Sequence, residues 1–213
     1  MYTPRHFEEP RLDVLHELMR RQSLATLVTF GPKGLNANHL PLYLDASSGP
    51  RGVLRGHVSR ANPVWKDLDP AVEALAVFSG PEAYITPSWY ATKRETDEAV
   101  PTWNYVVVHA HGPLRVIEDP DWLRAHVGEL TRHQEADLPE PWRVEQAPAE
   151  YIARLLGGIV GLEIVISRIE GKWKVSQNQP EANRQGVIAG LEESGEARAA
   201  AMAALVRSRG GTV

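Results

Sequence analysis

Short apolar stretches separated by turn residues run through the first sixty positions of the chain. Leu24 to Phe30 is apolar and partly β-branched, and Leu35 to Leu44 and Gly52 to Val58 continue this pattern, which is typical of strands. Gly31-Pro32-Lys33-Gly34 and Ser47-Ser48-Gly49-Pro50 stand between them and predict turns. Strands joined by such short turns indicate an antiparallel meander and not β–α–β units.

The rest of the chain adds strands and helices. Further strands are expected at Glu73 to Ser79, Ala83 to Thr86 and Trp103 to Ile117, the last with a bend at Gly112-Pro113, since proline cannot donate to a central ladder. Val160 to Ile169 and Trp173 to Ser176 predict a closing hairpin around Glu170-Gly171. Helices are expected at Pro10 to Arg21, from the capping Asp119-Pro120 to about His133, at Glu150 to Ile159, and from Pro180 to Arg207 with a break near Gly195.

These elements predict a mainly β fold with peripheral helices, an antiparallel barrel or sandwich of six to eight strands. At 213 residues the chain fits one domain, or one domain with a helical appendage. We expect a domain over residues 1–180 and a C-terminal helical extension over residues 181–213.

Composition narrows the class of protein. The sequence has no run of about 18 apolar residues, and its start has no basic segment followed by an apolar one, so we expect neither a membrane span nor a secretory signal. The chain has 0 cysteines, which excludes disulfides and thiol chemistry and fits a cytoplasmic location. Its formal net charge of −4 argues against a general nucleic-acid binder.

Residues 55–63, RGHVSRANP, form the clearest candidate for anion binding. A strand ends there, the hydroxyl of Ser59 and the guanidinium of Arg60 follow, and Asn62-Pro63 supplies an N-cap and a first helical residue. Free backbone N–H groups at a helix start suit a phosphate monoester. The alternative is an ordinary N-cap beside a solvated arginine.

Two other stretches carry polar and aromatic groups. Residues 84–112 gather Trp89, Trp103, Asn104, Tyr105 and two histidines, which either pack in the core or face a planar ligand. Residues 172–178, KWKVSQN, place Lys172, Lys174 and Ser176 on one side of a strand. This side is either a solvated strand face or a second arm of an anion site.

Histidines offer a metal alternative, because His109 and His111 share one strand face and His39 and His57 lie on other strands. Acidic partners at diagnostic spacing and an HExxH pattern are missing, so we expect no metal. Walker and Gly-x-Ser-x-Gly motifs are absent too. The glycines at 157–161 follow a predicted helix and precede a strand, the wrong order for a dinucleotide fold.

Six blocks occur in an order that resembles the PaiB family, described as FMN-binding negative transcriptional regulators of sporulation and degradative-enzyme genes. The blocks are NHLP (38–41), LRGHVSRANP (54–63), YITPSWY (84–90), VPTWNY (100–105), HAHG (109–112) and KWKVSQN (172–178).

The resemblance implies an FMN-binding split β-barrel of antiparallel, Greek-key type, assembled as a homodimer with two flavin sites at the subunit interface. Ser59, Arg60 and Asn62 would hold the phosphate. The full set of implied cofactor-binding residues is Asn38, His39, Leu40, His57, Ser59, Arg60, Asn62, Trp103, Asn104, Tyr105, Lys174, Ser176 and Gln177.

The family's regulatory role raises a physical difficulty, because the sequence shows neither a helix-turn-helix nor a basic recognition helix. We expect regulation through flavin or small-molecule sensing or through a protein partner, in preference to direct DNA binding. The alternative is an FMN-dependent oxidoreductase, similar to a flavin reductase or pyridoxamine phosphate oxidase, acting on a small substrate; whether the chain is an enzyme stays open. A third hypothesis is a haem-binding barrel with His39, His57, His109 and His111 as candidate ligands.

Overall fold

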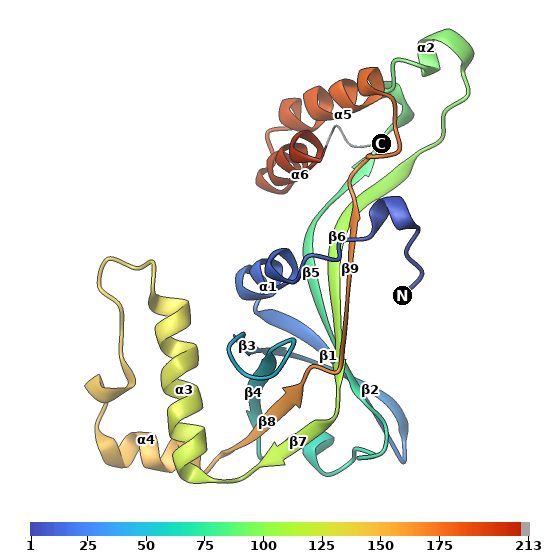
Figure 1. Ribbon diagram of the computed structural model, residues 1–213. Helices are drawn as coiled ribbons and strands as arrows, with labels where there is room; N and C mark the ends of the chain where they lie inside the picture. The colour runs from blue at the N-terminus through green and yellow to red at the C-terminus, as the bar shows by residue number, and fades with distance from the viewer. Residues whose placement is uncertain (210–213) are drawn as a thin grey trace. The chain divides into compact units, whose positions relative to one another are not determined.

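The computed structural model describes residues 1–209, which form two antiparallel sheets and six α-helices (Figure 1). The strands are β1 (Leu24–Gly31), β2 (Gly34–Pro41), β3 (Tyr43–Asp45), β4 (Val53–Ser59), β5 (Ala74–Ile85), β6 (Thr102–Gly112), β7 (Leu114–Ile117), β8 (Ile159–Val165) and β9 (Arg168–Lys174). The α-helices are α1 (Leu12–Arg21), α2 (Lys93–Thr96), α3 (Pro120–Glu135), α4 (Ala149–Leu156), α5 (Glu181–Glu193) and α6 (Ala197–Ser208). The last four residues of the predicted C-terminal extension lie outside the described residues.

One sheet has the strand order β2-β1-β5-β6-β9 and the other β3-β4-β8-β7. The pairings of β1 with β2 and of β4 with β8 are antiparallel, so the prediction of a mainly β, antiparallel fold with helices is confirmed. The β1–β2 hairpin runs in register from Leu24 opposite Pro41 to Gly31 opposite Gly34. The sequence predicted this hairpin from its Gly-Pro-Lys-Gly turn.

The chain divides into two compact units. Of the described residues, the first unit contains 1–15, 79–108 and 170–209, and the second contains 16–78 and 109–169. Strands β5, β6 and β9 each contribute residues to both units.

The second unit combines strands whose residues alternate between buried and exposed with a cluster of helices. Along β1, Ala25 and Leu27 are fully buried while Leu24 is exposed, as expected for a sheet with one face on the core. Helix α3 begins with the predicted cap, since the Asp119 side chain accepts a hydrogen bond from the Asp121 N–H at 2.9 Å. A small apolar cluster joins α3 to α4 and β8, and its buried members are Leu123, Val144, Ile152 and Leu156.

The predicted closing hairpin is wrong. Strand β8 pairs within the sheet of β4, whereas β9 belongs to the sheet of β6. Glu170-Gly171 lies inside β9 and forms no turn. A Cβ on Gly171 would stand 2.2 Å from the Leu15 side chain and 2.9 Å from the Glu9 carbonyl oxygen. Gly171 therefore allows the N-terminal segment to approach β9 closely. In the sequence, the same glycine was interpreted as a turn signal.

Two other strand boundaries also differ from the prediction. The predicted strand over 35–44 is divided into β2 and β3 at Leu42, whose N–H donates to the Ser23 carbonyl at 2.8 Å. The two predicted strands over 73–86 are one continuous strand, β5. Within residues 1–209, none of the helices is both long and apolar enough to span a membrane.

A buried carboxylate joins the two ends of the chain in the first unit. Glu9 is 1% exposed, and its oxygens accept hydrogen bonds from Arg11 at 2.9 Å and from Arg209. The Arg209 guanidinium also lies over the Trp173 ring, 5.8 Å from its centroid. Burial alone would raise the pKa of Glu9, but the hydrogen bonds from Arg11 and Arg209 lower it to about 2.

We predict acid sensitivity from this group. Because the folded-state pKa lies below the ordinary value of 4.5, Glu9 stabilises the fold fully above pH 4.5, and this contribution is lost as the pH falls towards 2. Glu9→Gln should lower the unfolding free energy at pH 7 by about 2 kcal/mol and flatten its slope between those pH values. Urea unfolding at several pH values measures both. Glu8→Gln, at an exposed neighbour, is the control. An unchanged pH slope in Glu9→Gln would contradict this role.

Candidate functional site

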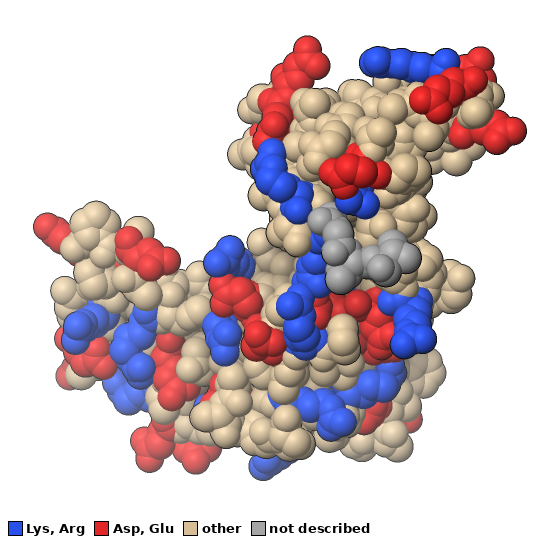
Figure 2. Space-filling view, turned by 45° about the horizontal axis from the view of Figure 1, so that its top comes forward, with Lys and Arg blue, Asp and Glu red and all other residues tan. Residues whose placement is uncertain are grey.

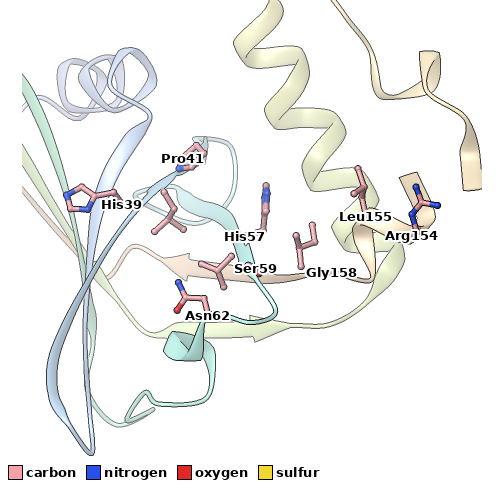
Figure 3. A pocket seen from close by; sticks show the side chains of 11 residues that line it. His39, Pro41, His57, Ser59, Asn62, Arg154, Leu155 and Gly158 are labelled. Atoms are coloured by element: carbon pink, nitrogen blue, oxygen red, sulfur yellow. The ribbon is translucent and has the colours of Figure 1, made fainter. Parts of the chain in front are cut away.

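A pocket of about 500 Å³ lies in the second unit, at the end of β4 (Figure 3). Strand β2 contributes His39, Leu40 and Pro41, and the opposite wall comes from α4 and the start of β8. The complete lining is His39, Leu40, Pro41, His57, Val58, Ser59, Asn62, Arg154, Leu155, Gly158 and Ile159. Five of the residues singled out in the sequence therefore lie around one cavity: His39, Leu40, His57, Ser59 and Asn62.

Amide side chains fix the edge of the pocket nearest β2. The Asn62 Nδ2 donates to Asn38 Oδ1 at 2.7 Å, and Asn38 Nδ2 donates to Asn36 Oδ1 at 2.8 Å. Asn62 Oδ1 accepts from the Val64 N–H at 3.0 Å, so Asn62 is the N-cap that the sequence predicted for a short 3₁₀ helix, Pro63–Trp65. Asn38 thus contacts the pocket residue Asn62 and is not itself among the residues that line the pocket.

The backbone amides around this helix start have partners within the protein. The N–H groups of Arg60 and Asn62 donate to the carbonyls of Gly158 and Ser59, both at 2.8 Å. The Ala61 N–H donates to Ser59 Oγ at 3.3 Å. These three amides, which the sequence analysis expected to be free for a ligand, are therefore engaged within the protein. Anion binding here would depend on side chains, and the Ser59 hydroxyl keeps its own proton for a ligand.

Arg60 is engaged by the protein itself. Its Nε donates to the Gly157 carbonyl at 3.1 Å and one terminal nitrogen donates to the Ile159 carbonyl at 3.3 Å. The other terminal nitrogen forms a 2.5 Å ion pair with Glu118. The guanidinium thereby joins the end of β4 to the start of β8. Its assignment to a ligand phosphate stays a prediction.

A second cation, Arg154, lies at the α4 side of the pocket (Figure 3). Within the described residues its guanidinium packs on Tyr151, 5.4 Å from the ring centroid, and forms no ion pair. Sequence inspection missed Arg154 because it lies on a helix about ninety residues after β4. The end of α4 lies close to Arg60, whose N–H donates to the Gly158 carbonyl, and no local sequence pattern indicates this contact.

His57 reaches from β4 to a buried histidine on α3. Its Nδ1 lies 3.1 Å from His126 Nε2, and the His126 ring is stacked on Trp122 with centroids 5.2 Å apart. Burial lowers the pKa of His57. Burial, with the neighbouring His57 and Arg55, lowers the pKa of His126 to about 3. Both rings are therefore neutral near pH 8. The sequence analysis did not single out His126.

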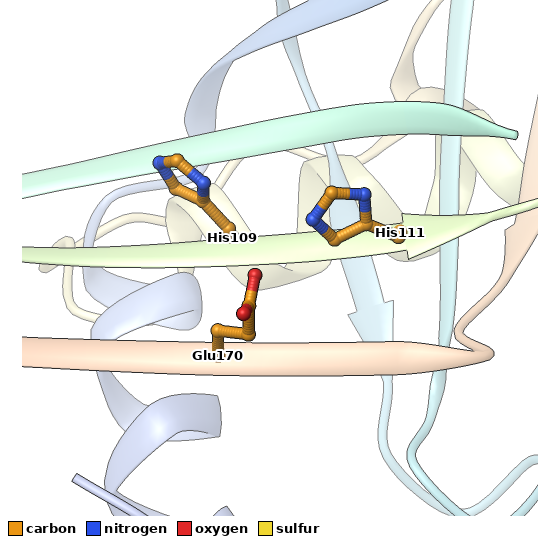
Figure 4. Close-up of side chains that lie close together, drawn as sticks. All are labelled: His109, His111 and Glu170. Atoms are coloured by element: carbon orange, nitrogen blue, oxygen red, sulfur yellow. The ribbon is translucent and has the colours of Figure 1, made fainter. Parts of the chain in front are cut away.

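The other two histidines that were candidate haem or metal ligands lie on β6. His109 and His111 have ring centroids 6.4 Å apart, and Figure 4 shows both on β6 and Glu170 on β9. Among residues 1–209, neither His39 nor His57 belongs to a group of three side chains able to hold a metal ion. The four histidines therefore do not form the common cluster considered from the sequence.

The remaining predicted site residues belong to the first unit. Asn104 is 1% exposed, and its Nδ2 donates to Ser176 Oγ at 2.9 Å. Lys174 Nζ donates to Thr102 Oγ1 at 2.5 Å, and Gln177 accepts from the Val175 N–H at 2.8 Å. Trp103 is 54% exposed, and its ring lies 5.9 Å from that of Tyr84. Lys172 Nζ lies over the ring of Tyr105, 5.2 Å from its centroid. Their roles toward a cofactor stay predictions.

Comparisons with known proteins agree with the sequence blocks. Residues 1–168 match the family described as "Putative FMN-binding domain". The chain is 30% identical to the protease synthase and sporulation protein PAI 2 of Bacillus subtilis, over 98% of both chains. It is 34% identical to an uncharacterized protein of Emericella nidulans, over 99% of this chain and 98% of the other.

Among solved structures, the fold is similar to that of the FAD and haem binding protein of Mycobacterium smegmatis. The TM-score is 0.57 at 14% sequence identity, covering 86% of this chain and 80% of that one. At this identity the likeness concerns the fold. The match over residues 1–168 and the Bacillus relative establish that the chain belongs to this FMN-binding family, as the ordered blocks indicated.

Proposed function

We propose that the chain binds FMN in the pocket at the end of β4, within a split β-barrel fold. The observation that carries this proposal is the meeting of Ser59, Asn62, His57 and Arg154 around one cavity of about 500 Å³. Cofactor pockets commonly enclose about 300–1,000 Å³ and combine apolar walls with a few polar groups. Leu40, Val58 and Ile159 supply the apolar wall.

The phosphate would lie between Ser59 and Arg154. A phosphate accepts hydrogen bonds from hydroxyl and guanidinium groups, and Arg presents several donors to it at once. Arg60 already donates to two carbonyls and Glu118, so it would support the pocket wall. In this arrangement Arg154 and not Arg60 carries the charge that recognises the phosphate.

A second copy of the chain would complete the site. Leu24, Phe30 and Leu35 are 67%, 44% and 78% exposed, and Phe30 is paired with Leu35, so these side chains share one face of the β1–β2 hairpin. The face continues to His39 and Pro41, which line the pocket. An exposed apolar surface beside a cofactor pocket favours a homodimer with the flavin at the interface.

The proposal includes a regulatory role, in which the protein responds to flavin or to a protein partner. The Bacillus relative is named for protease synthesis and sporulation, which supports a role in regulation. On the face shown in Figure 2, Lys and Arg side chains alternate with Asp and Glu. A dimer would carry a formal charge of about −8, twice the −4 of one chain, and would repel the phosphate backbone of DNA.

The first prediction from this proposed function concerns the phosphate group of FMN. Titration with protein should quench the fluorescence of FMN, and Arg154→Gln should weaken FMN binding about tenfold, because one charge-assisted hydrogen bond is lost. Riboflavin, which has no phosphate, should bind equally to both proteins. Arg124→Gln on the exposed side of α3 is the matched control. Equal loss of FMN and riboflavin affinity, or no loss of either, would contradict the assignment of Arg154.

The second prediction concerns assembly. The wild-type chain should have the mass of a dimer by light scattering. Leu35→Asp should yield a folded monomer, because a charge on the apolar face cannot be buried without a partner. Leu138→Asp, at another exposed leucine, should leave the dimer intact. A monomeric wild-type chain, or a dimeric Leu35→Asp variant, would exclude the proposed interface.

The third prediction concerns DNA. Selection from a random duplex library at about 100 mM salt should enrich no sequence with nanomolar affinity, since the charge of the chain opposes the binding of phosphates. The same selection in the presence of FMN should give the same result. Enrichment of a nanomolar site in either selection would show direct operator binding and overturn regulation through flavin or a protein partner.

A further inference from the structure

The contact between His57 and His126 requires a definite placement of protons. The two facing nitrogens, His57 Nδ1 and His126 Nε2, are 3.1 Å apart, so one of them carries a hydrogen and the other offers a lone pair. With both rings neutral, two arrangements are available. Either His126 donates from Nε2 to His57, or His57 donates from Nδ1 to His126.

The far side of the His126 ring distinguishes the two arrangements. His126 is 1% exposed, and its Nδ1 is buried with no hydrogen-bond partner among the described residues. If His57 were the donor, neutral His126 would carry its proton on Nδ1, as a buried N–H without an acceptor, a rare arrangement in proteins. If His126 is the donor, its Nδ1 is a bare lone pair.

The surroundings hold the His126 ring in place. Trp122 stacks on it at an interplanar angle of 23°, one turn earlier on α3. Trp122 itself occupies the space above Gly161, where an added Cβ would lie 2.4 Å from the indole ring. Gly161 is the residue paired with His57 across β4 and β8. The indole and both imidazoles therefore form one packed group over this strand pair.

The charged neighbours of the pair are neutralised among themselves. Arg55, two residues before His57 on β4, forms ion pairs with Asp45 at 3.2 Å, Glu129 at 3.5 Å and Glu163 at 3.3 Å. Glu163 on β8 also pairs with Arg115 at 3.0 Å. These carboxylates are directed to guanidinium groups, and within residues 1–209 neither histidine forms a hydrogen bond with them. In the described part of the chain, these acids therefore do not favour a charged histidine pair.

From this geometry we propose that His126 is a positioning residue that fixes the tautomer of His57, so that His57 presents Nε2–H as a hydrogen-bond donor to the ligand in the pocket. The ligand group it takes is a hydrogen-bond acceptor, such as a carbonyl oxygen or ring nitrogen of the flavin or a phosphate oxygen. The placement of the proton is a property of the chain alone, and the contact with the ligand rests on the proposed function.

The proton can be located directly in the ligand-free protein. Long-range ¹H–¹⁵N correlation spectra at pH 8, with His57 and His126 assigned by substitution, distinguish a protonated imidazole nitrogen from a bare one. We expect both rings to carry their proton on Nε2. A proton on Nδ1 of His57 would overturn the proposal, whatever the protein does with flavin.

Two variants test the effect on binding. Glutamine at position 126 keeps an N–H donor for His57 Nδ1, whereas methionine has similar length and no donor. His126→Met should weaken FMN binding about tenfold, the equivalent of one hydrogen bond, and His57 should no longer be held in one tautomer. His126→Gln should retain affinity near that of the wild-type protein and keep the Nε2–H form.

The outcomes separate the two proposals. If His126→Met binds FMN as tightly as His126→Gln, His126 does not act through His57, and the positioning role is wrong. If the wild-type chain binds no flavin, the proposed function fails, but the spectra of the ligand-free protein still decide whether His57 presents Nε2–H. The spectra also report whether each variant keeps the native fold.

Discussion

The antiparallel pairing of β4 with β8 is the constraint on which the candidate site depends. Its register places His57 opposite Gly161 and Ser59 opposite Ile159, and His57, Ser59 and Ile159 of this strand pair line the pocket. Arg60 reinforces the end of this pair through the carbonyls of Gly157 and Ile159. A slip of β4 by one residue would turn His57 and Ser59 to the other face of the sheet.

Local chemistry made much of this arrangement predictable. Asn62 and Asp119 were recognisable in the sequence as helix caps because each precedes a proline. In the structure, each side chain accepts a hydrogen bond from a backbone N–H. The β1–β2 hairpin followed from its turn residues. Elements that depend on distant contacts were not predictable. Glu170-Gly171 resembles a turn, but the glycine admits Leu15, and nothing in the local sequence shows that a helix side chain approaches there.

The same distinction explains the site residues. Ser59 and Asn62 follow one another at the end of β4, so the local pattern identified them, whereas His39 and His57 came from the family resemblance. The pocket brings the four together. Arg154 and His126 lie on helices whose positions are set by the apolar cluster of Leu123, Ile152 and Leu156. Arg154 and His126 reach the site because of how these helices pack, and a single sequence carries little signal for such packing. In the same way, the partners of Arg60 are carbonyls of Gly157 and Ile159, which no side-chain pattern reveals.

The most direct test of the account is a crystal structure of the protein grown with FMN. The account predicts electron density for one flavin in each pocket, with its phosphate within hydrogen-bond distance of Ser59 and the Arg154 guanidinium, and His57 Nε2 facing an acceptor atom of the ligand. Flavin bound at a site without these three residues, or pockets that stay empty at millimolar FMN, would contradict the central claim that the end of β4 is the cofactor site.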